Sequence, residues 1–221
     1  MNGSARTGFA LTIRLGFGNS RQTLIIMRGQ AMPKYDYEVE RAAQVLAYFA
    51  LRAKDRALNI LKAMKLVYLA DRESIRRFGE PMLDEPRYSM KRGPVNHMTY
   101  QLASGQEDQP AEWSRYLHAR DQSHDIAVRG NITFGSLGEL SEDDVECLDA
   151  VWRQFGWMDE HVLCAWTHKP ENVPEWSNPN GGRKPISLAD MLAAVGVPDA
   201  RQRAEDLEHR GSLKQLVETV R

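Results

Sequence analysis

Residues 61–95 constrain this 221-residue chain more than any other stretch. They read LKAMKLVYLADRESIRRFGEPMLDEPRYSMKRGPV and predict an apolar helix, a short strand at 87–91 rich in Arg and Lys, and a second helix. Gly79 and Pro81 are typical of a helix end, and Pro94 suits the first position of the next helix. The stretch contains no nucleophile–base pair, phosphate-binding loop or complete set of metal ligands. It therefore predicts a scaffold that holds a partner rather than an enzyme.

One carboxylate lies on the apolar face of the helix predicted at 55–78. Asp71 falls between Tyr68 and Ile75 on that face. An unpaired carboxylate on a core-facing stripe is unfavourable, so we expect a bond to Tyr68, to Arg72 or to a backbone N–H of the following loop. Asp71 is thus predicted either to anchor that loop or to have a partner-binding or catalytic role.

The remaining pattern predicts a mostly α fold of the α+β type, with a small antiparallel β element and a helical C-terminal tail. Further helices are expected at 36–53, 94–104, 141–155, 159–168, 187–196, 199–210 and 212–221. Two short strands, 125–129 and 131–134, flank Gly130 and suggest a small hairpin or meander within a β-rich segment at 113–137. Residues 170–182 are rich in Pro, Asn and Gly and are expected to form a loop.

Three parts are predicted along the chain. Residues 1–31 carry four arginines and no acid, which resembles an organellar presequence. We interpret them instead as a disordered extension or a mis-assigned start ahead of Met32, because helix patterning begins only at Asp36. Residues 32–180 are predicted to be the main domain, and residues 181–221 a helical extension.

A cytoplasmic location without a membrane span is expected. The longest apolar run near the start, residues 24–27, is too short for a signal core or a membrane helix. Two cysteines, Cys147 and Cys164, are too few for a disulfide scaffold, so both are expected to be reduced.

The strongest metal-like pattern is His161-x-x-Cys164-x-x-x-His168. On a helix the two histidines start about 10 Å apart, and only Cys164 and His168 have the i, i+4 spacing of helical metal ligands. A buried thiol and two hydrogen-bonded histidines are the favoured interpretation, with no metal and no cofactor. Cys147 lies mid-helix without a sharp turn, which argues against a nucleophile.

Charge suggests a partner but does not identify it. The net charge is -1, while the first half of the chain is basic and the second half acidic, so an acidic partner for the first half is expected. A basic patch is predicted from Arg72, Arg76, Arg77, Arg87, Lys91 and Arg92. This patch would suit nucleic acid, a protein or no partner at all. The helix expected after Pro94 has few basic residues, which weakens a helix-turn-helix interpretation.

The order and spacing of several short motifs resemble the SocA-like antitoxins, the Panacea antitoxin domain family, which is often phage-associated. The motifs are Lys65-Leu66-Val67-Tyr68-Leu69-Ala70-Asp71, Gly79-x-Pro81, Tyr88-x-Met90-x-x-Gly93-Pro94-Val95, Leu140-Ser141, and Thr167-His168 followed by Trp176. The resemblance spans about residues 35–176. It implies a mostly helical domain with a small sheet, and an antitoxin that binds and neutralises its cognate toxin. For SocA-like members it also implies a proteolytic adaptor that delivers the toxin to the ClpXP protease.

These motifs supply the candidate site. Partner-binding roles are predicted for Tyr68, Asp71, Arg72, Tyr88, Met90, Lys91 and Arg92. Structural roles are predicted for Gly79, Pro81, Gly93, Pro94, His168 and Trp176. Two alternatives stay open: a DNA-binding autoregulator, and a metal-dependent hydrolase that uses Asp71, Cys164 or His168.

Overall fold

The computed structural model describes residues 35, 37–119 and 124–220, the last range without the side chains of 212–220. The predictions for residues 1–31, including the choice between Met1 and Met32 as the first residue, lie outside the described residues. Residues Asp36–Arg221 form one unit, and its architecture confirms the mostly α, α+β fold class.

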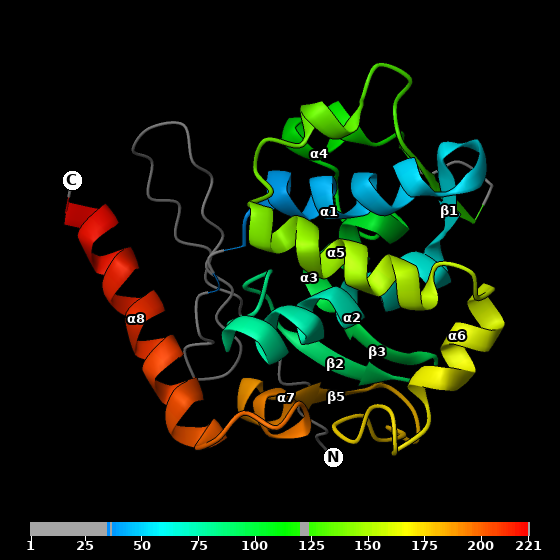
Figure 1. Ribbon diagram of the computed structural model, residues 1–221. Coiled ribbons are helices and arrows are strands. Elements are labelled where there is room, and N and C mark those ends of the chain that lie inside the picture. The colour runs from blue at the N-terminus through cyan, green and yellow to red at the C-terminus, as the bar shows by residue number, and fades with distance from the viewer. Residues whose placement is uncertain (1–34, 36, 120–123, 221) are drawn as a thin grey trace, which may run out of the picture. The chain divides into compact units, whose positions relative to one another are not determined.

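Three packed helices form the centre of this unit. They are α1 (Val39–Arg52), α2 (Ile60–Phe78) and α5 (Glu142–Phe155). Phe49, Leu66 and Leu148 are fully buried in the core to which these helices contribute. Three shorter helices lie around them in Figure 1: α3 (His97–Ser104), α4 (Ala111–Tyr116) and α6 (Glu160–Thr167). Apolar faces at helical spacing therefore produce a shared core, as the periodicity predicts.

Capping residues set the ends of α2 and α5. The Asn59 side chain accepts a hydrogen bond from the Leu61 N–H, so α2 begins later than the predicted Asp55. Gly79 ends α2 in the left-handed conformation (φ 70°), which confirms the predicted stop. Ser141 and Asp144 cap α5 reciprocally, which confirms the helix start at Ser141.

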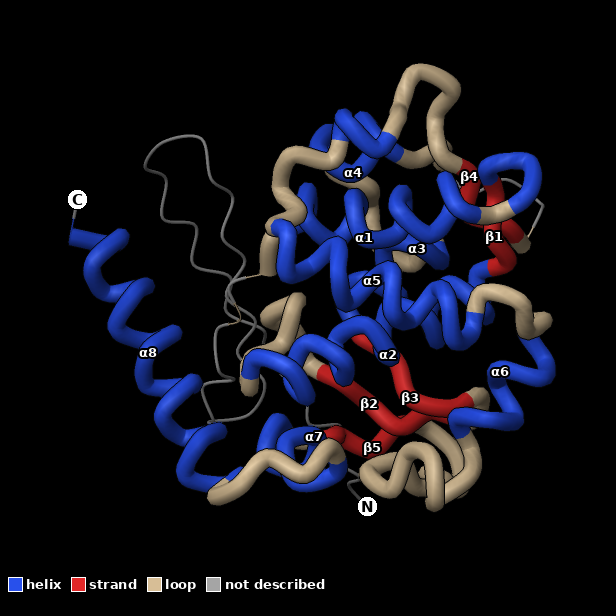
Figure 2. The backbone as a smooth tube through the Cα atoms, viewed as in Figure 1, coloured by secondary structure: helices blue, strands red, loops and turns tan. Residues whose placement is uncertain are grey.

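A three-stranded antiparallel sheet lies beside the helices. Its strands are β2 (Arg87–Met90), β3 (Gly93–Asn96) and β5 (Arg183–Ile186), in the order β3-β2-β5. Met90 pairs with Gly93 on one side and with Arg183 on the other. Lys91 and Arg92 therefore form a two-residue hairpin turn at the same end of the sheet as the start of β5. Figure 2 shows the three strands beside α2, with β5 close to α7 (Leu188–Ala194).

The predicted helix start at Pro94 is wrong. Gly93 and Pro94 belong to β3, and α3 begins only at His97. Gly93 takes a positive φ of 97°, which lets the chain turn sharply after Arg92. A residue before proline avoids the helical region, and a strand at the sheet edge tolerates a missing N–H. The Gly-Pro pair thus closes a hairpin here instead of opening a helix.

The predicted hairpin around Gly130 is also wrong. Strand β4 (Asp125–Ala127) pairs with β1 (Ala57–Asn59), which lies far away in the sequence. The last residue of its predicted second strand, Phe134, begins the 3₁₀ turn Phe134–Ser136. Helix α4 occupies the start of the segment 113–137, which was predicted to be β-rich. Periodicity identifies extended residues but does not identify a distant partner strand.

The C-terminal segment adds a second core and contradicts one predicted break. The separate helices predicted at 199–210 and 212–221 are a single helix, α8 (Ala200–Val220), which continues through Gly211. The second core joins α2, β5, α7 and α8. Its buried members include Tyr68, Ile75, Ile186, Met191, Leu192 and Ala204. β5 lies beyond residue 180, so the sheet contains strands from both sides of the predicted domain boundary. No helix in the described part of the chain is long and apolar enough to cross a membrane.

Candidate partner-binding surface

Asp71 connects α2 to the sheet and to the loop before it. Its side chain is 1% exposed, and Oδ1 accepts a hydrogen bond of 3.0 Å from the Leu83 N–H. Oδ2 accepts bonds from Arg87 Nε (2.6 Å) and Asn96 Nδ2 (3.1 Å). Of the partners expected for Asp71, the loop N–H is present, while Tyr68 and Arg72 bond elsewhere. Since a buried carboxylate needs compensating charge and donors, this network fixes β2 and β3 against α2.

Glu175 holds the loop 170–182 in the same way. Its side chain is fully buried and accepts hydrogen bonds from Tyr68 Oη (2.8 Å) and Arg72 Nε (2.6 Å). Burial, followed by the charge of Glu175, raises the pKa of Tyr68 well above its usual value, so the hydroxyl stays a donor. Tyr68 and Asp71 are both buried, so a partner cannot reach their side chains from the surface of this structure.

A third buried acid fixes the entry to the hairpin. Glu85 has no exposed surface and accepts hydrogen bonds from the Thr99 N–H (2.9 Å) and Thr99 Oγ1 (2.6 Å). Burial raises its pKa to about 7, while the two bonds from Thr99 oppose this shift. The loop before β2 is therefore held to α3.

The turn of the hairpin rests on α2 and α6. A Cβ added to Gly93 would lie 2.9 Å from Lys65 Nζ and 2.9 Å from Thr167 Oγ1. Lys65 is fully buried and donates to the Pro94 carbonyl at 2.7 Å, and Cys164 Sγ donates to the Arg92 carbonyl at 3.4 Å. Burial lowers the pKa of Lys65 to about 7. Only glycine fits this close approach of the turn to the two helices.

His168 and Trp176 cover the hairpin from the adjacent loop. Their ring centroids are 4.3 Å apart, and Trp176 Nε1 donates to the Met90 carbonyl at 3.3 Å. Burial, and then the charge of Lys65, lowers the pKa of His168, which favours a neutral ring. The motif residues from distant parts of the sequence thus meet around one hairpin.

Four exposed cations gather at the supported end of the sheet. Lys91 and Arg92 form the turn, and Arg183 and Lys184 begin β5, which pairs with β2 at that end. None of the four has an ion pair within the described residues. We call these four residues the basic end. Tyr88 and Met90 lie beside it and are half-buried.

The sequence identified only half of the basic end. Lys91 ends the strand predicted at 87–91 and Arg92 follows it directly, but Arg183-Lys184-Pro185-Ile186 is too short to predict a strand and contains a proline. The one available signal was Gly181-Gly182, which marks a turn before that run.

Four of the six residues predicted to form a larger basic patch are paired with acidic side chains. Arg72 is paired with Glu175 and Arg87 with Asp71, while Arg76 and Arg77 share Glu73. Only Lys91 and Arg92 of that set lack an acidic partner among the described residues. The patch therefore does not present the continuous positive stripe that nucleic-acid binding favours.

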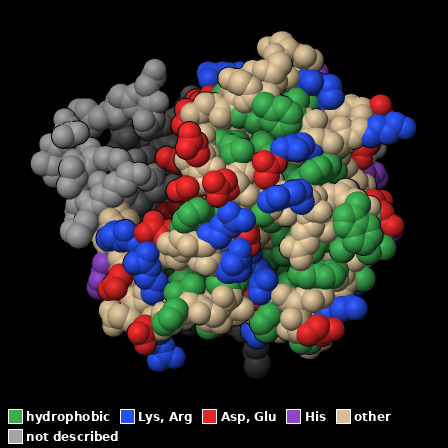
Figure 3. All heavy atoms as spheres, in the orientation of Figure 1, with side chains coloured by type: hydrophobic (Ala, Val, Ile, Leu, Met, Phe, Trp, Pro, Cys, Tyr) green, Lys and Arg blue, Asp and Glu red, His purple; other side chains and the backbone are tan. Residues whose placement is uncertain are grey.

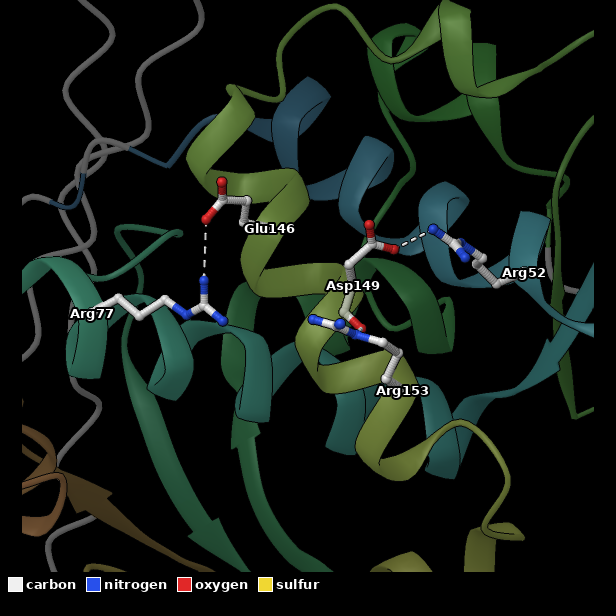
Figure 4. Close-up of a pocket in the computed structure, with 5 residues that line it drawn as sticks. All are labelled: Arg52, Arg77, Glu146, Asp149 and Arg153. Carbon is white, nitrogen blue, oxygen red and sulfur yellow. Dashed lines mark hydrogen bonds and ion pairs between the residues drawn. The ribbon is translucent and has the colours of Figure 1, made fainter.

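A separate surface depression is also rich in arginine. Figure 4 shows its lining on α1, α2 and α5, which consists of Arg52, Arg77, Glu146, Asp149 and Arg153. Arg52 pairs with Asp149, and Arg77 contacts Glu146 at 3.2 Å. Figure 3 shows the same mixture of Lys and Arg with Asp and Glu over this face of the molecule. These charges largely satisfy one another, so the depression offers less unbalanced charge than the basic end.

Nucleophilic and metal chemistry find little support in the described residues. Burial raises the pKa of Cys147 to about 11, so its thiol is protonated at neutral pH. His161 is exposed at the start of α6, whereas His168 lies at the other end of that helix. In the described ranges no group of three or more His, Cys, Asp or Glu side chains is placed to hold a metal ion.

One protein-family model covers most of the residues described above. The family model of the antitoxin SocA-like, Panacea domain matches residues 63–176. The match includes Asp71, the whole β2–β3 hairpin, α5, α6 and Trp176, and it ends before β5. Searches of curated proteins and of solved structures found no match. Because the family match covers just over half of the chain, this protein belongs to the family of SocA-like antitoxins with a Panacea domain.

Proposed function

We propose that this antitoxin neutralises its cognate toxin by direct binding, and that the basic end of the sheet contacts an acidic surface of the toxin. The observation that carries the proposal is the set of four exposed cations without ion pairs among the described residues. Arg and Tyr side chains are frequent hot spots of protein interfaces. Tyr88 and Met90, half-buried beside the cations, add apolar area to the same surface.

The rigidity of the hairpin supports this role. Asp71, Lys65 and Trp176 fix the hairpin from three directions through the contacts given above. A surface that is already ordered loses little conformational entropy when it binds, so more of its contact energy appears as affinity. Complementary charge also accelerates the encounter with a partner of opposite sign. An antitoxin of this kind needs shape and charge rather than reactive groups.

We further propose that the protein is a proteolytic adaptor in the cytoplasm that delivers the bound toxin to the ClpXP protease. This part rests on the resemblance to SocA-like members. In this proposal residues 32–180 form the toxin-neutralising domain, and residues 181–221 form an extension that adds β5 to its sheet.

Co-expression tests both parts. The candidate toxin from the adjacent gene is induced alone, with the wild-type protein, and with a Lys91→Ala/Arg92→Ala variant, in cells with and without ClpXP. An Arg76→Ala/Arg153→Ala variant is the matched control, because it also removes two exposed cations but on other elements. Growth and toxin abundance are scored.

We expect the wild type and the control variant to rescue growth and the hairpin variant to fail. Loss of the toxin protein only in cells with ClpXP would support the adaptor mechanism. Rescue with abundant toxin would mean neutralisation by occlusion alone. Full rescue by the hairpin variant would place the interface elsewhere.

A further inference from the structure

Arg183 is the most preorganised cation of the basic end, although it lies outside the residues that match the family. The match ends at residue 176, whereas Arg183 is the first residue of β5. β5 pairs with β2 along its whole length, so it brings a side chain from outside the family match next to the hairpin.

Two aromatic rings hold the Arg183 guanidinium in place. The guanidinium carbon lies 4.6 Å from the centroid of the Tyr88 ring, a cation–π geometry. The His97 ring packs edge-on against Tyr88, with centroids 4.9 Å apart and ring planes at 73°. Arg183 Nη1 is hydrogen-bonded to His97 Nε2. The three side chains form a stack that comes from β2, α3 and β5.

His97 is suited to accept that bond. Burial, and then the neighbouring Arg183, lowers the pKa of His97 to about 4, so the ring is neutral at physiological pH. The bond to Arg183 makes Nε2 the acceptor and leaves the proton on Nδ1. The guanidinium is then held by the Tyr88 ring on one face and by the hydrogen bond from Nη1 to His97. Its other N–H donors have no partner within the described residues.

A fixed guanidinium with unused donors matches a carboxylate. Arginine presents a planar fork that binds both carboxylate oxygens, and a lysine cannot reproduce this geometry. Strand addition is a poor alternative at this edge, because Pro185 removes one N–H from β5. Recognition at β5 therefore relies on side chains.

We propose that Arg183 selects the partner: it binds an Asp or Glu side chain on the toxin, so β5 determines which toxin this family member recognises. This inference rests on the proposed function. Arg183 acts directly on the partner, while Tyr88 and His97 position it.

Binding of purified toxin to four proteins tests the inference: the wild type, Arg183→Lys, Arg183→Ala and Arg153→Ala. The Arg183→Lys variant keeps the charge and loses the planar fork. Arg153→Ala is the matched control, because it removes an exposed arginine of α5, outside the basic end. We expect both Arg183 variants to bind about 10- to 100-fold more weakly, as for hydrogen bonds between charged groups. The control should lose at most about fivefold. Unchanged melting temperatures would exclude a folding defect.

The toxin's acidic residues are then changed to Ala one at a time. One of these changes should weaken binding to the wild type but not to Arg183→Ala, as expected when two residues contact each other. If Arg183→Lys bound the toxin as tightly as the wild type, or if no toxin carboxylate showed this coupling, the assignment of Arg183 would be refuted while direct binding stood. The assignment would also be refuted if the Arg183 variants bound the toxin normally and lost affinity only for duplex DNA. A wild type that bound no toxin would overturn the proposed function itself.

Discussion

Replacing Lys65 by Met should change how the stability of this protein depends on pH. Lys65 is fully buried, and its ammonium has one hydrogen-bond acceptor among the described residues, the Pro94 carbonyl. Burial lowers its pKa from 10.5 to about 7. At about 1.4 kcal/mol for each pH unit, holding this ammonium in the folded protein costs about 5 kcal/mol at pH 7 or below.

The sign follows from where the proton binds. The unfolded chain keeps Lys65 protonated up to about pH 10.5, whereas the folded protein releases the proton above about pH 7. The contribution of Lys65 to the stability of the folded protein is therefore least favourable below pH 7, and it becomes more favourable as the pH rises from 7 towards 10.5. Met removes this gain. It also leaves the Pro94 carbonyl without its donor, which costs about 1–3 kcal/mol. The variant should thus be more stable by about 2–4 kcal/mol at pH 7.

Urea unfolding at pH 7.5, 8.5 and 9.5 measures the effect. The free energy of unfolding of the wild type should rise by about 2–3 kcal/mol relative to Lys65→Met over this range. Lys91→Met is the control, because it replaces an exposed lysine of the hairpin turn. Parallel pH profiles for the wild type and Lys65→Met would refute the argument that a desolvated ammonium supports this turn.

Three further substitutions test the supports of the hairpin. Gly93→Val should destabilise the fold by more than about 2 kcal/mol, since its Cβ would lie 2.9 Å from Lys65 Nζ and its φ is positive; Gly130→Val, with open space around it, is the control in the same urea titration. Asp71→Ala should cost about 3–5 kcal/mol because it leaves a buried guanidinium unpaired, whereas the exposed Arg76→Ala should cost less than about 1 kcal/mol by chemical denaturation. Glu85→Gln should remove a pH dependence of stability whose sign is opposite to that from Lys65. The pKa of Glu85 is raised from 4.5 to about 7 in the folded protein. The free energy of unfolding of the wild type should therefore fall by about 2–3 kcal/mol relative to the variant as the pH rises from 5 to 7, measured by thermal or urea unfolding.

Local patterns in the sequence were sufficient for the core helices and for the helix stop at Gly79. They also identified Asp71 as a carboxylate that needs partners, because a charge on an apolar stripe is visible in periodicity alone. They failed at Gly93-Pro94, where the same two residues suit a helix start or a hairpin. The choice depends on Lys65 and Thr167, which meet the turn only in three dimensions.

The candidate site shows the same division between local and distant information. Lys91 and Arg92 were visible at the end of the predicted strand 87–91 and directly after it. Arg183 and Lys184 were not, since β5 is a strand only because β2 pairs with it. The burial of Tyr68 follows from contact with residues of the second core, among them Ile186 and Met191. No pattern near Tyr68 in the sequence indicates those partners.

The position of β5 has a consequence for synthesis of the protein. The β2–β3 hairpin pairs residues that are close in the sequence, so its two strands can pair on the ribosome before β5 emerges. β5 emerges much later, after α5, α6 and the loop that carries Glu175. We therefore expect the nascent antitoxin to acquire its complete sheet, and with it Arg183, only after β5 has left the ribosome. Its capacity to recognise a partner should lag behind the folding of its helical core.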